Sequence, residues 1–340
     1  MDTHISTSSA SRSLFLLSFL FILSYLSSPT LSTSERCHPD DKRALLRIKE
    51  ALNIPDHLAS WNVSTDCCYW DYVGCHTETN RIYQLLIYDT SIHGPIPPSV
   101  GDLPYLETLV FSDINNLTGP IPYSITKLQN LKMLRIIWTP LSGRIPDLIS
   151  QLKNLEYLDL SRNQFSGSIP ASLANLRKLT GLQLEGNKLS GSIPDSFGRF
   201  KDNLYVFVLS QNMLSGKIPK SLGQLDCESI DLSHNKLVGD AKMLFRENSS
   251  VKGLDLSRNR LDFDLSNVKF PKNLTFLDLS YNRIRGSIPQ QVTELDLWRM
   301  DFSYNRLCGR IPVGGKVQQF GYETFTHNLC LCGTPLPECK

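Results

Sequence analysis

Hydrophobic residues recur along this chain with a period of about 24 residues. An Ile-Pro pair occurs at positions 96, 121, 145, 169, 193, 218, 288 and 311, in steps of 23–25 residues with one gap of 70, which is three periods. The segment Leu155 to Pro170, LEYLDLSRNQFSGSIP, shows the whole unit: L-x-x-L-x-L-x-x-N, a further apolar residue, then S-G-x-I-P. Each unit therefore combines a short alternating stretch with a turn-forming stretch.

This unit is the pattern of a leucine-rich repeat. The alternation in L-x-L predicts a short strand whose leucines point inward and whose intervening residue faces solvent. Stacking such units gives a parallel sheet on one face of a solenoid. We therefore expect an α/β solenoid: a right-handed leucine-rich-repeat superhelix of about ten 24-residue repeats, with a concave parallel β-sheet and disulfide-bonded caps.

A column of side-chain amides is expected inside the solenoid. An Asn side chain carries both donors and an acceptor, so a buried column can satisfy the turn backbone from coil to coil. We interpret this column as structural and not as a ligand site. Its predicted members are Asn115, Asn163, Asn187, Asn212, Asn235, Asn259, Asn282 and Asn305, with Thr90 and Thr139 in the same place.

The two ends of the chain differ from the repeats. Leu14 to Leu26 is an apolar run of 13 residues, too short for a comfortable membrane span but suited to a secretory signal, with small residues before Glu35. We predict a signal peptide at 1–34, an N-terminal cap at 35–76, ten repeats at 77–312 and a C-terminal cap at 313–340. In the N-terminal cap, Leu45, Ile48 and Leu52 fall on one helical face. No apolar run long enough to span a membrane follows the signal peptide.

The cysteines lie where an open solenoid needs support. A secreted chain forms disulfides by default, and clusters of four near each end predict two bonds per cap. Three connectivities are open in each cluster; we favour Cys37–Cys67, Cys68–Cys75, Cys308–Cys330 and Cys332–Cys339. Zinc is the alternative, but the usual paired C-x₂₋₄-C spacing is missing. Cys227 takes a core leucine position, so we expect a buried free thiol.

The solvent-facing residue between the strand leucines defines a concave column. Unit by unit it is Leu86, Val110, Arg135, Asp159, Gln183, Val208, Asp231, Asp255, Asp278 and Asp301. Aromatic and apolar residues flank it: Tyr88, Ile137, Trp138, Tyr157, Val206, Tyr281 and Tyr304, with His234 on the rim. Apart from Leu86, Ile137 and Val206, these are the predicted partner-binding residues. Trp138 is the strongest interface candidate; packing on a neighbouring unit, and ordinary solubility for the Asp residues, are the alternatives.

A second column follows the Asn column and is mostly basic. Its basic members could bind an acidic polysaccharide such as pectate, or pair with the Asp column; a solvated edge is the further alternative. They are Lys188, Lys236, Arg260, Arg283 and Arg306. Asn62, Asn116, Asn248 and Asn273 open N-x-S/T sequons and are predicted glycan acceptors.

Composition and motifs narrow the function. Lys plus Arg total 35 and Asp plus Glu total 33, a net charge of +2, which argues against a nucleic-acid partner. The sequence has no G-x-S-x-G, H-E-x-x-H, P-loop or dinucleotide motif, and His234 has no nucleophile in pattern. We expect no enzymatic activity, no cofactor and no metal.

The caps and the repeat together resemble the plant polygalacturonase-inhibiting proteins. The resemblance rests on ERCHPDDKRALLRIKEAL, DCCYWDYVGC, LSGxIP and LCGRIPVGG…NLCLCGTPLPEC, and it covers the whole mature chain. It implies a secreted protein of the plant cell wall, or apoplast, that binds microbial or insect endopolygalacturonases through its concave face and limits pectin degradation. A plant antifreeze protein is also similar. An extracellular recognition module, as a receptor partner or peptide binder, and an ice-binding protein remain the alternatives.

Overall fold

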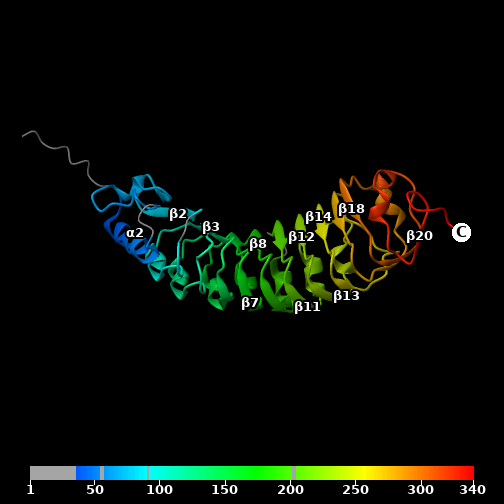
Figure 1. Ribbon diagram of the computed structural model, residues 1–340, viewed down its shortest axis with the longest axis horizontal. Coiled ribbons are helices and arrows are strands. Elements are labelled where there is room, and N and C mark those ends of the chain that lie inside the picture. The colour runs from blue at the N-terminus through cyan, green and yellow to red at the C-terminus, as the bar shows by residue number, and fades with distance from the viewer. Residues whose placement is uncertain (1–35, 54–56, 90–91, 201–203) are drawn as a thin grey trace, which may run out of the picture. The chain divides into compact units, whose positions relative to one another are not determined.

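The computed structural model describes residues 36–53, 57–89, 92–200 and 204–340. The predicted signal peptide at 1–34 and Thr90, a predicted member of the amide column, lie outside them. Residues Cys37–Lys340 form one compact unit. That unit is an arc of stacked coils, with β2, β8, β12, β14 and β18 along its inner edge (Figure 1). No helix among the described residues is both long enough and apolar enough to cross a membrane.

The inner face of the arc is an 11-stranded sheet. Its first two strands pair antiparallel and all later neighbours pair parallel. In sheet order the strands are β1 (Val73–Cys75), β2 (Ile82–Tyr88), β3 (Thr108–Ser112), β4 (Met133–Ile137), β6 (Tyr157–Asp159), β8 (Gly181–Gln183), β10 (Val206–Val208), β12 (Ser229–Asp231), β14 (Gly253–Asp255), β16 (Phe276–Asp278) and β18 (Arg299–Asp301).

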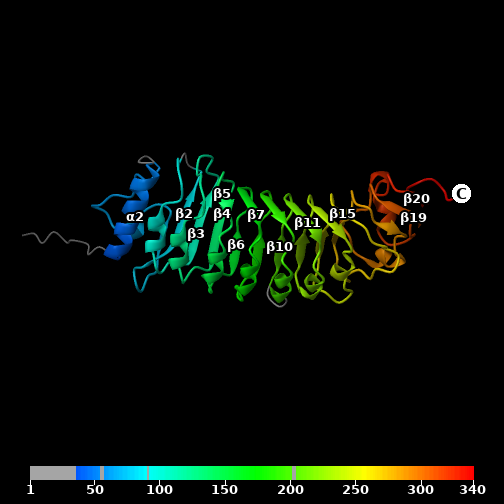
Figure 2. The same ribbon diagram turned by 90° about the horizontal axis from the view of Figure 1, so that it is seen from below.

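A second row of strands runs beside the inner sheet. Figure 2 shows β5, β7, β11 and β15 of this row following one another along the solenoid. The row forms a six-stranded sheet of β5 (Ser142–Arg144), β7 (Gln164–Ser168), β9 (Lys188–Gly191), β11 (Met213–Lys217), β13 (Lys236–Gly239) and β15 (Arg260–Leu261). A three-stranded sheet of β17 (Arg285–Gly286), β19 (Arg306–Arg310) and β20 (Cys330–Cys332) follows it.

Seven of the eight Ile-Pro pairs directly precede a short 3₁₀ helix, whereas after Ile311-Pro312 the next such helix begins only at Val317. Proline fixes φ near the helical value and has no N–H to leave unpaired, so it suits the entry to a helix. The helices are η2 (Pro98–Asp102), η3 (Tyr123–Lys127), η4 (Asp147–Gln151), η5 (Ala171–Asn175), η6 (Asp195–Phe200), η7 (Lys220–Gln224), η8 (Lys242–Leu244) and η9 (Gln290–Glu294). η8 lies in the stretch that lacks Ile-Pro, and it follows Ala241 instead.

The N-terminal end is closed by a helix and two disulfides. Helix α2 (Pro39–Leu52) buries Leu45, Ile48 and Leu52, the face that its periodicity predicts, and η1 (Cys67–Tyr69) follows it. Asp41 is also buried, because its carboxylate accepts hydrogen bonds from the Arg81 guanidinium at 2.6 and 2.9 Å and from the backbone N–H of Ile82 at 3.0 Å. This bidentate pair ties the cap helix to the first strand of the parallel sheet.

The cysteines pair as the sequence analysis favours. The disulfides are Cys37–Cys67, Cys68–Cys75, Cys308–Cys330 and Cys332–Cys339. Cys227 is a buried free thiol in the core, and burial raises its pKa to about 12. Two short helices, η10 (Val317–Gln319) and η11 (Tyr322–Thr324), complete the C-terminal end.

Buried amides join successive coils. Asn235 donates from Nδ2 to the carbonyls of Leu209, Leu232 and Ser233 and accepts at Oδ1 from the N–H of Leu214. The same arrangement recurs down the solenoid, and it continues into the C-terminal cap at Asn328, which the sequence analysis did not place in the column. Each amide thus satisfies backbone groups of two coils at once.

One predicted member of the amide column is wrong. Asn115 is exposed, and the buried residue at its place is Ile114. This coil carries one extra residue between its strand and the next core residue, Leu117, so the amide moves outward by one position. Its neighbour in the next coil, Thr139, does join the column, because its hydroxyl donates to the side-chain Oδ1 of Asn163.

We expect Asn235→Ala to lower the free energy of unfolding by about 2–4 kcal/mol, because it leaves buried backbone groups of two coils without partners. Thermal and urea unfolding followed by circular dichroism measure this loss. Asn115→Ala is the matched control, and it should stay within about 0.5 kcal/mol of the parent chain. Equal losses in the two variants would contradict the structural role of the column.

Candidate functional site

The predicted concave column is formed in register. Strand pairing aligns Leu86, Val110, Arg135, Asp159 and Gln183 on successive rungs, and then Val208, Asp231, Asp255, Asp278 and Asp301. Because neighbouring strands lie about 4.8 Å apart, one column places a side chain on the inner face at each step. The first rungs are apolar and the last four are acidic, so the face changes chemistry along the arc.

The aspartates of this column also serve the fold. In each of five coils the Asp Oδ1 atom accepts a hydrogen bond from the backbone N–H of the Ser two residues later, at 2.9–3.0 Å. This is a local carboxylate-to-backbone turn that holds the end of the strand. The L-D-L-S pattern is therefore explained in part by backbone satisfaction, and only the second carboxylate oxygen is available to a partner.

Two of these aspartates are not solvent-facing as predicted. Asp159 is 3% exposed and Asp278 is 6% exposed. Arg135 on the neighbouring strand covers Asp159, with Nε 3.2 Å from Oδ2. Asp278 accepts from both the N–H and the hydroxyl of Ser280, and Arg299 lies 3.8 Å away. The strand register points both carboxylates to the concave face, but the neighbouring side chains of Arg135 and Arg299 cover them there.

Burial shifts the acidity of the remaining column. Desolvation raises the pKa of Asp255 to about 6, opposed by its hydrogen bonds from Ser257, and the negative Asp231 and Asp278 on the adjacent strands raise it further. Desolvation likewise raises the pKa of Asp301. The charge of this half of the face consequently depends on pH in the mildly acidic range.

A rim of left-handed residues borders the concave sheet. The residue directly before a member of the amide column adopts a left-handed φ between 50° and 66°. These residues are Trp138, Arg162, Gly186, Gln211, His234, Arg258, Tyr281, Tyr304 and His327. The turn at this position directs the side chain to the edge of the inner face. The sequence analysis selected four of these residues, Trp138, His234, Tyr281 and Tyr304, because it looked for aromatic and His side chains beside the L-x-L column. It did not treat the left-handed position as a column of its own, and therefore missed the others.

Side chains of the rim stack on one another. Tyr281 and Tyr304 are parallel with ring centroids 4.1 Å apart, and His327 continues the stack 4.0 Å from Tyr304. The Arg258 guanidinium lies 4.2 Å from the centroid of Tyr281. Because the ring faces cover each other, this end of the rim offers ring edges and polar atoms. Burial and the positive charge of Arg258 lower the pKa of His234 beside the stack.

Trp138 is the most open aromatic side chain of the rim in the first half of the arc. It is 54% exposed, and the Arg162 guanidinium lies 5.2 Å from its ring. Ile137, expected beside it on the surface, is buried at 6%, because the strand alternation breaks at the turn and sends two successive residues, Ile136 and Ile137, inward. Tyr88 remains exposed on the first strand of the parallel series.

Tyr157 is less available than its position suggests. Its ring covers Gly181 on the next strand, its hydroxyl donates to the side-chain oxygen of Gln183, and burial raises its pKa. Tyr157 and Gln183 are therefore partly engaged with each other within the sheet.

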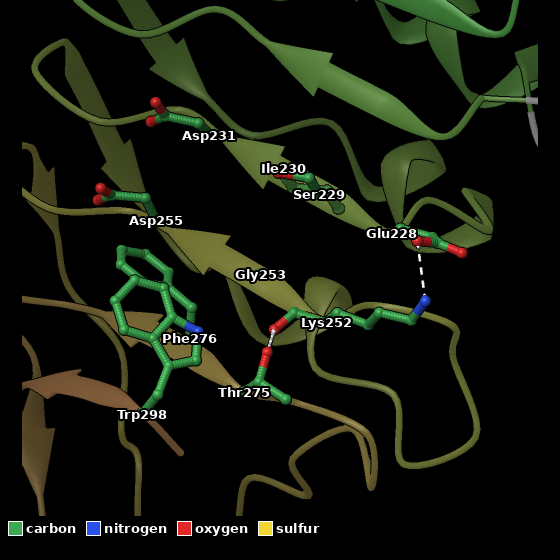
Figure 3. A pocket seen from close by; sticks show the side chains of 10 residues that line it. All are labelled: Glu228, Ser229, Ile230, Asp231, Lys252, Gly253, Asp255, Thr275, Phe276 and Trp298. Carbon is green, nitrogen blue, oxygen red and sulfur yellow. Dashed lines mark hydrogen bonds and ion pairs between the residues drawn. The ribbon is translucent and has the colours of Figure 1, made fainter. Parts of the chain in front are cut away.

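A cavity of about 430 Å³ opens in the acidic half of the face. Figure 3 shows Phe276 and Trp298 on one side of it and the Asp231 and Asp255 carboxylates on adjoining strands. At the other end Lys252 pairs with Glu228 at 2.9 Å. The sequence analysis missed Phe276, Trp298 and Lys252, which occupy the two positions ahead of L-x-L; an unusual aromatic pair at those positions was the available signal.

The basic strip lies at the entrance to the second row of strands. Lys188, Lys236, Arg260, Arg283 and Arg306 are all exposed, and Met213 interrupts the series. Lys188, Lys236 and Arg260 each begin a strand of this row, and Arg306 begins β19 of the following sheet. The register pairs Lys188 with Ser166, Lys236 with Ser215 and Arg260 with Val238, so successive members of the strip are offset by two residues. The sequon residues Asn62, Asn116, Asn248 and Asn273 are also exposed, and glycosylation there stays a prediction.

The described residues offer one close group with metal-ligand atoms, Cys37, Cys68 and Cys75. All three sulfur atoms are already bonded in the disulfides of the N-terminal cap. This group therefore belongs to the cap.

Comparison with known proteins places these features in a family context. A family model described as "Leucine rich repeat N-terminal domain" matches residues 38–76, and leucine-rich-repeat models match 145–189, 203–225 and 273–295. A "Polygalacturonase inhibitor" of Vitis vinifera is 57% identical over 96% of this chain and 98% of its own length, and one of Pyrus communis is 58% identical over 95% and 98%. The crystal structure of a plant ice-binding protein superposes with a TM-score of 0.87 at 46% identity, covering 90% of this chain and 99% of that one.

We expect Asp255→Asn to raise stability progressively from pH 4 to pH 7. The folded pKa is about 6 and the unfolded value about 3.9, so the folded chain binds more protons between them and loses stability as pH rises through that window. The amide removes this charge while its oxygen can still accept from Ser257. Melting temperatures of parent and variant across this pH range measure the effect.

The control is Asp113→Asn, which removes one exposed carboxylate and changes the net charge by the same amount. A difference between Asp255→Asn and the parent chain that is constant with pH would argue against a buried, titrating Asp255.

Proposed function

The chain belongs to the plant polygalacturonase inhibitor family, and we propose that it binds a microbial or insect endopolygalacturonase through the concave face of the solenoid. The observation that carries the proposal is the full-length identity of 53–58% to relatives of that name. The function is one of inhibition by binding, with no turnover by this chain.

Electrostatic complementarity supports the choice of face. Pectate is a polyanion, so an enzyme that cleaves it needs a substrate cleft with cationic residues. Asp231, Asp255 and Asp301 present carboxylates at successive or near-successive rungs of the concave face. A surface of this sign attracts a cationic cleft and excludes the polyanionic substrate from it. Occlusion of the cleft is therefore the mechanism that this face favours.

The apolar half of the face supplies anchors. Trp138 and Tyr88 are exposed aromatic side chains, and Leu86 on β2 and Val110 on β3 are half-buried. Aromatic anchors next to an apolar area commonly dominate the binding energy of protein interfaces. We infer that the enzyme contacts both halves, with apolar contacts near Trp138 and ionic contacts at the acidic rungs.

We infer that the chain acts in the plant cell wall. The apolar leader at 14–26, the four disulfides and the extracellular character of the family support secretion into the apoplast. Pectin surrounds a protein in that compartment, and the exposed basic strip offers a complementary surface for its carboxylates. Pectin is thus the second partner that we propose.

Ice binding is a second candidate because of the plant ice-binding structure at 46% identity. Ice recognition needs a flat, regular array of similar side chains. Along the second row of strands, the exposed residues that begin β9, β11, β13 and β15 are Lys188, Met213, Lys236 and Arg260, which differ in length, charge and polarity. This row therefore favours a polysaccharide or protein partner over an ice lattice.

We expect Trp138→Ala to weaken inhibition of a sensitive endopolygalacturonase by about 30-fold or more, as truncation of a central aromatic anchor costs about 2 kcal/mol. Inhibition constants against a panel of fungal and insect enzymes measure the change. Tyr123→Ala is the matched control, since Tyr123 is an exposed aromatic residue on η3, away from the concave column.

No inhibition of any enzyme by the parent chain at micromolar concentration would contradict the proposed function. Specific binding to a receptor ectodomain in that case would favour a recognition module instead.

Charge reversal of Arg260, Arg283 and Arg306 to Glu should reduce retention on immobilised pectate at low salt, because three cationic contacts to the polyanion become repulsive. The salt concentration that elutes each variant is the measurement. The same reversal at Lys153, Lys178 and Lys220, exposed residues outside the strip, is the control. Retention that is unchanged in the Arg variant would exclude the strip as a pectin site.

A further inference from the structure

Two glycines occupy the same column of the concave sheet but have different surroundings. Above Gly181 the ring of Tyr157 fills the place of a side chain, and an added Cβ would collide with it. Above Gly253 an added Cβ would have a single neighbour within 4 Å, the hydroxyl of Ser229 at 3.7 Å. The Tyr157 ring thus fills the space above Gly181, whereas the space above Gly253 is empty. The 430 Å³ cavity lies at Gly253.

An aromatic ring forms one wall of this cavity. Strand register places Phe276 between Gly253 on β14 and Arg299 on β18. The Arg299 guanidinium lies over the Phe276 ring at 5.6 Å, and Trp298 packs against the ring at 5.4 Å. On the side of β14 the register provides no side chain at all. Phe276 therefore has the Arg299 guanidinium as a neighbour on one strand and Gly253, which has no side chain, on the other.

The charges around the cavity are unequal. Glu228 and Lys252 neutralise each other at one end. The other end holds Asp231 and Asp255, whose Oδ1 atoms accept backbone N–H groups of Ser233 and Ser257 and whose second oxygens can accept from a guest. An aromatic surface next to two carboxylates is complementary to a cation that also has an apolar stem.

We propose that this cavity receives an arginine side chain of the protein partner, with its guanidinium stacked on Phe276 and hydrogen-bonded to Asp231 and Asp255. A planar guanidinium stacks on rings and donates in a fork to carboxylates, which the compact ammonium of lysine does not do. The guest would repeat, on the open side of the ring, the contact that Arg299 makes on the other. The proposal rests on the proposed function for the identity of the partner, an endopolygalacturonase.

Gly253→Val tests the cavity directly. Gly253 lies in a strand without positive φ and has room for a Cβ, so a β-branched residue fits the backbone and fills the space. Thr108→Val is the matched control, because Thr108 holds the same column position on β3, far along the sheet. Phe276→Leu is a second variant that removes the ring and keeps an apolar side chain. Circular dichroism and melting temperature report the folding of each variant.

The first readout uses a small probe. Acetyl-Gly-Arg-Gly-amide is titrated at pH 7.5, where Asp255 is ionised, and the Trp298 indole signal is followed by NMR. We expect the peptide to bind at least about tenfold tighter than its citrulline counterpart, which has the same shape without the charge. Gly253→Val and Phe276→Leu should abolish this difference, and Thr108→Val should keep it. Equal binding of the two peptides to the parent chain would overturn the proposal.

The second readout is enzyme inhibition. Gly253→Val should raise the inhibition constant of a sensitive endopolygalacturonase at least about tenfold relative to Thr108→Val. Full inhibition by Gly253→Val would overturn the arginine site and leave the proposed function standing. A parent chain that inhibits no enzyme but binds the arginine peptide selectively would overturn the proposed function and leave the site standing.

Discussion

The column of buried amides is the interaction on which the rest of the structure depends. A coil of about 24 residues has too few internal contacts to be stable alone, and its turn exposes carbonyl and N–H groups toward the next coil. Asn163, Asn187, Asn212 and Asn235 each satisfy those groups with one side chain that reaches across the junction. The spacing that these amides impose sets the register of both rows of strands, and therefore of every surface column.

That register explains how binding features arise from a repeating fold. Along each strand, the alternation decides which residues face the concave side. From coil to coil, the strand spacing decides which of these residues become neighbours. Asp231, Asp255 and Asp301 acquire their acidic character as a group because this register aligns them, and burial modifies each one separately. Similarly, the open space at Gly253 is a property of three neighbouring rungs, since Ser229 is small and Phe276 does not lean over the glycine as Tyr157 does at Gly181.

The repeat period was sufficient to predict the solenoid and the inner sheet, and the helical periodicity of the cap predicted its helix. The cysteine positions predicted two bonds in each cap but left three connectivities open, of which the favoured one is observed. The repeat period was insufficient where one residue changes the local geometry. The extra residue before Leu117 moved Asn115 to the surface, and the turn after Ile136 carried Ile137 inward. Burial of Asp159 by Arg135 depends on a side chain 24 residues away, and the cavity depends on which aromatic ring covers which glycine. Those outcomes follow from side-chain packing between coils, which a linear pattern does not contain.

The left-handed rim has a consequence for how such a surface changes over time. Its backbone is fixed by hydrogen bonds to the adjoining coil, as at His234 and Tyr281, whose N–H groups donate to the carbonyls of Ser257 and Ser303. Residues as unlike as Trp138, Gln211, Arg258 and His327 share this one conformation. Replacement there alters what the edge displays and leaves the scaffold intact. Evolution can therefore vary the specificity of the rim one codon at a time, with little loss of folding competence along the way.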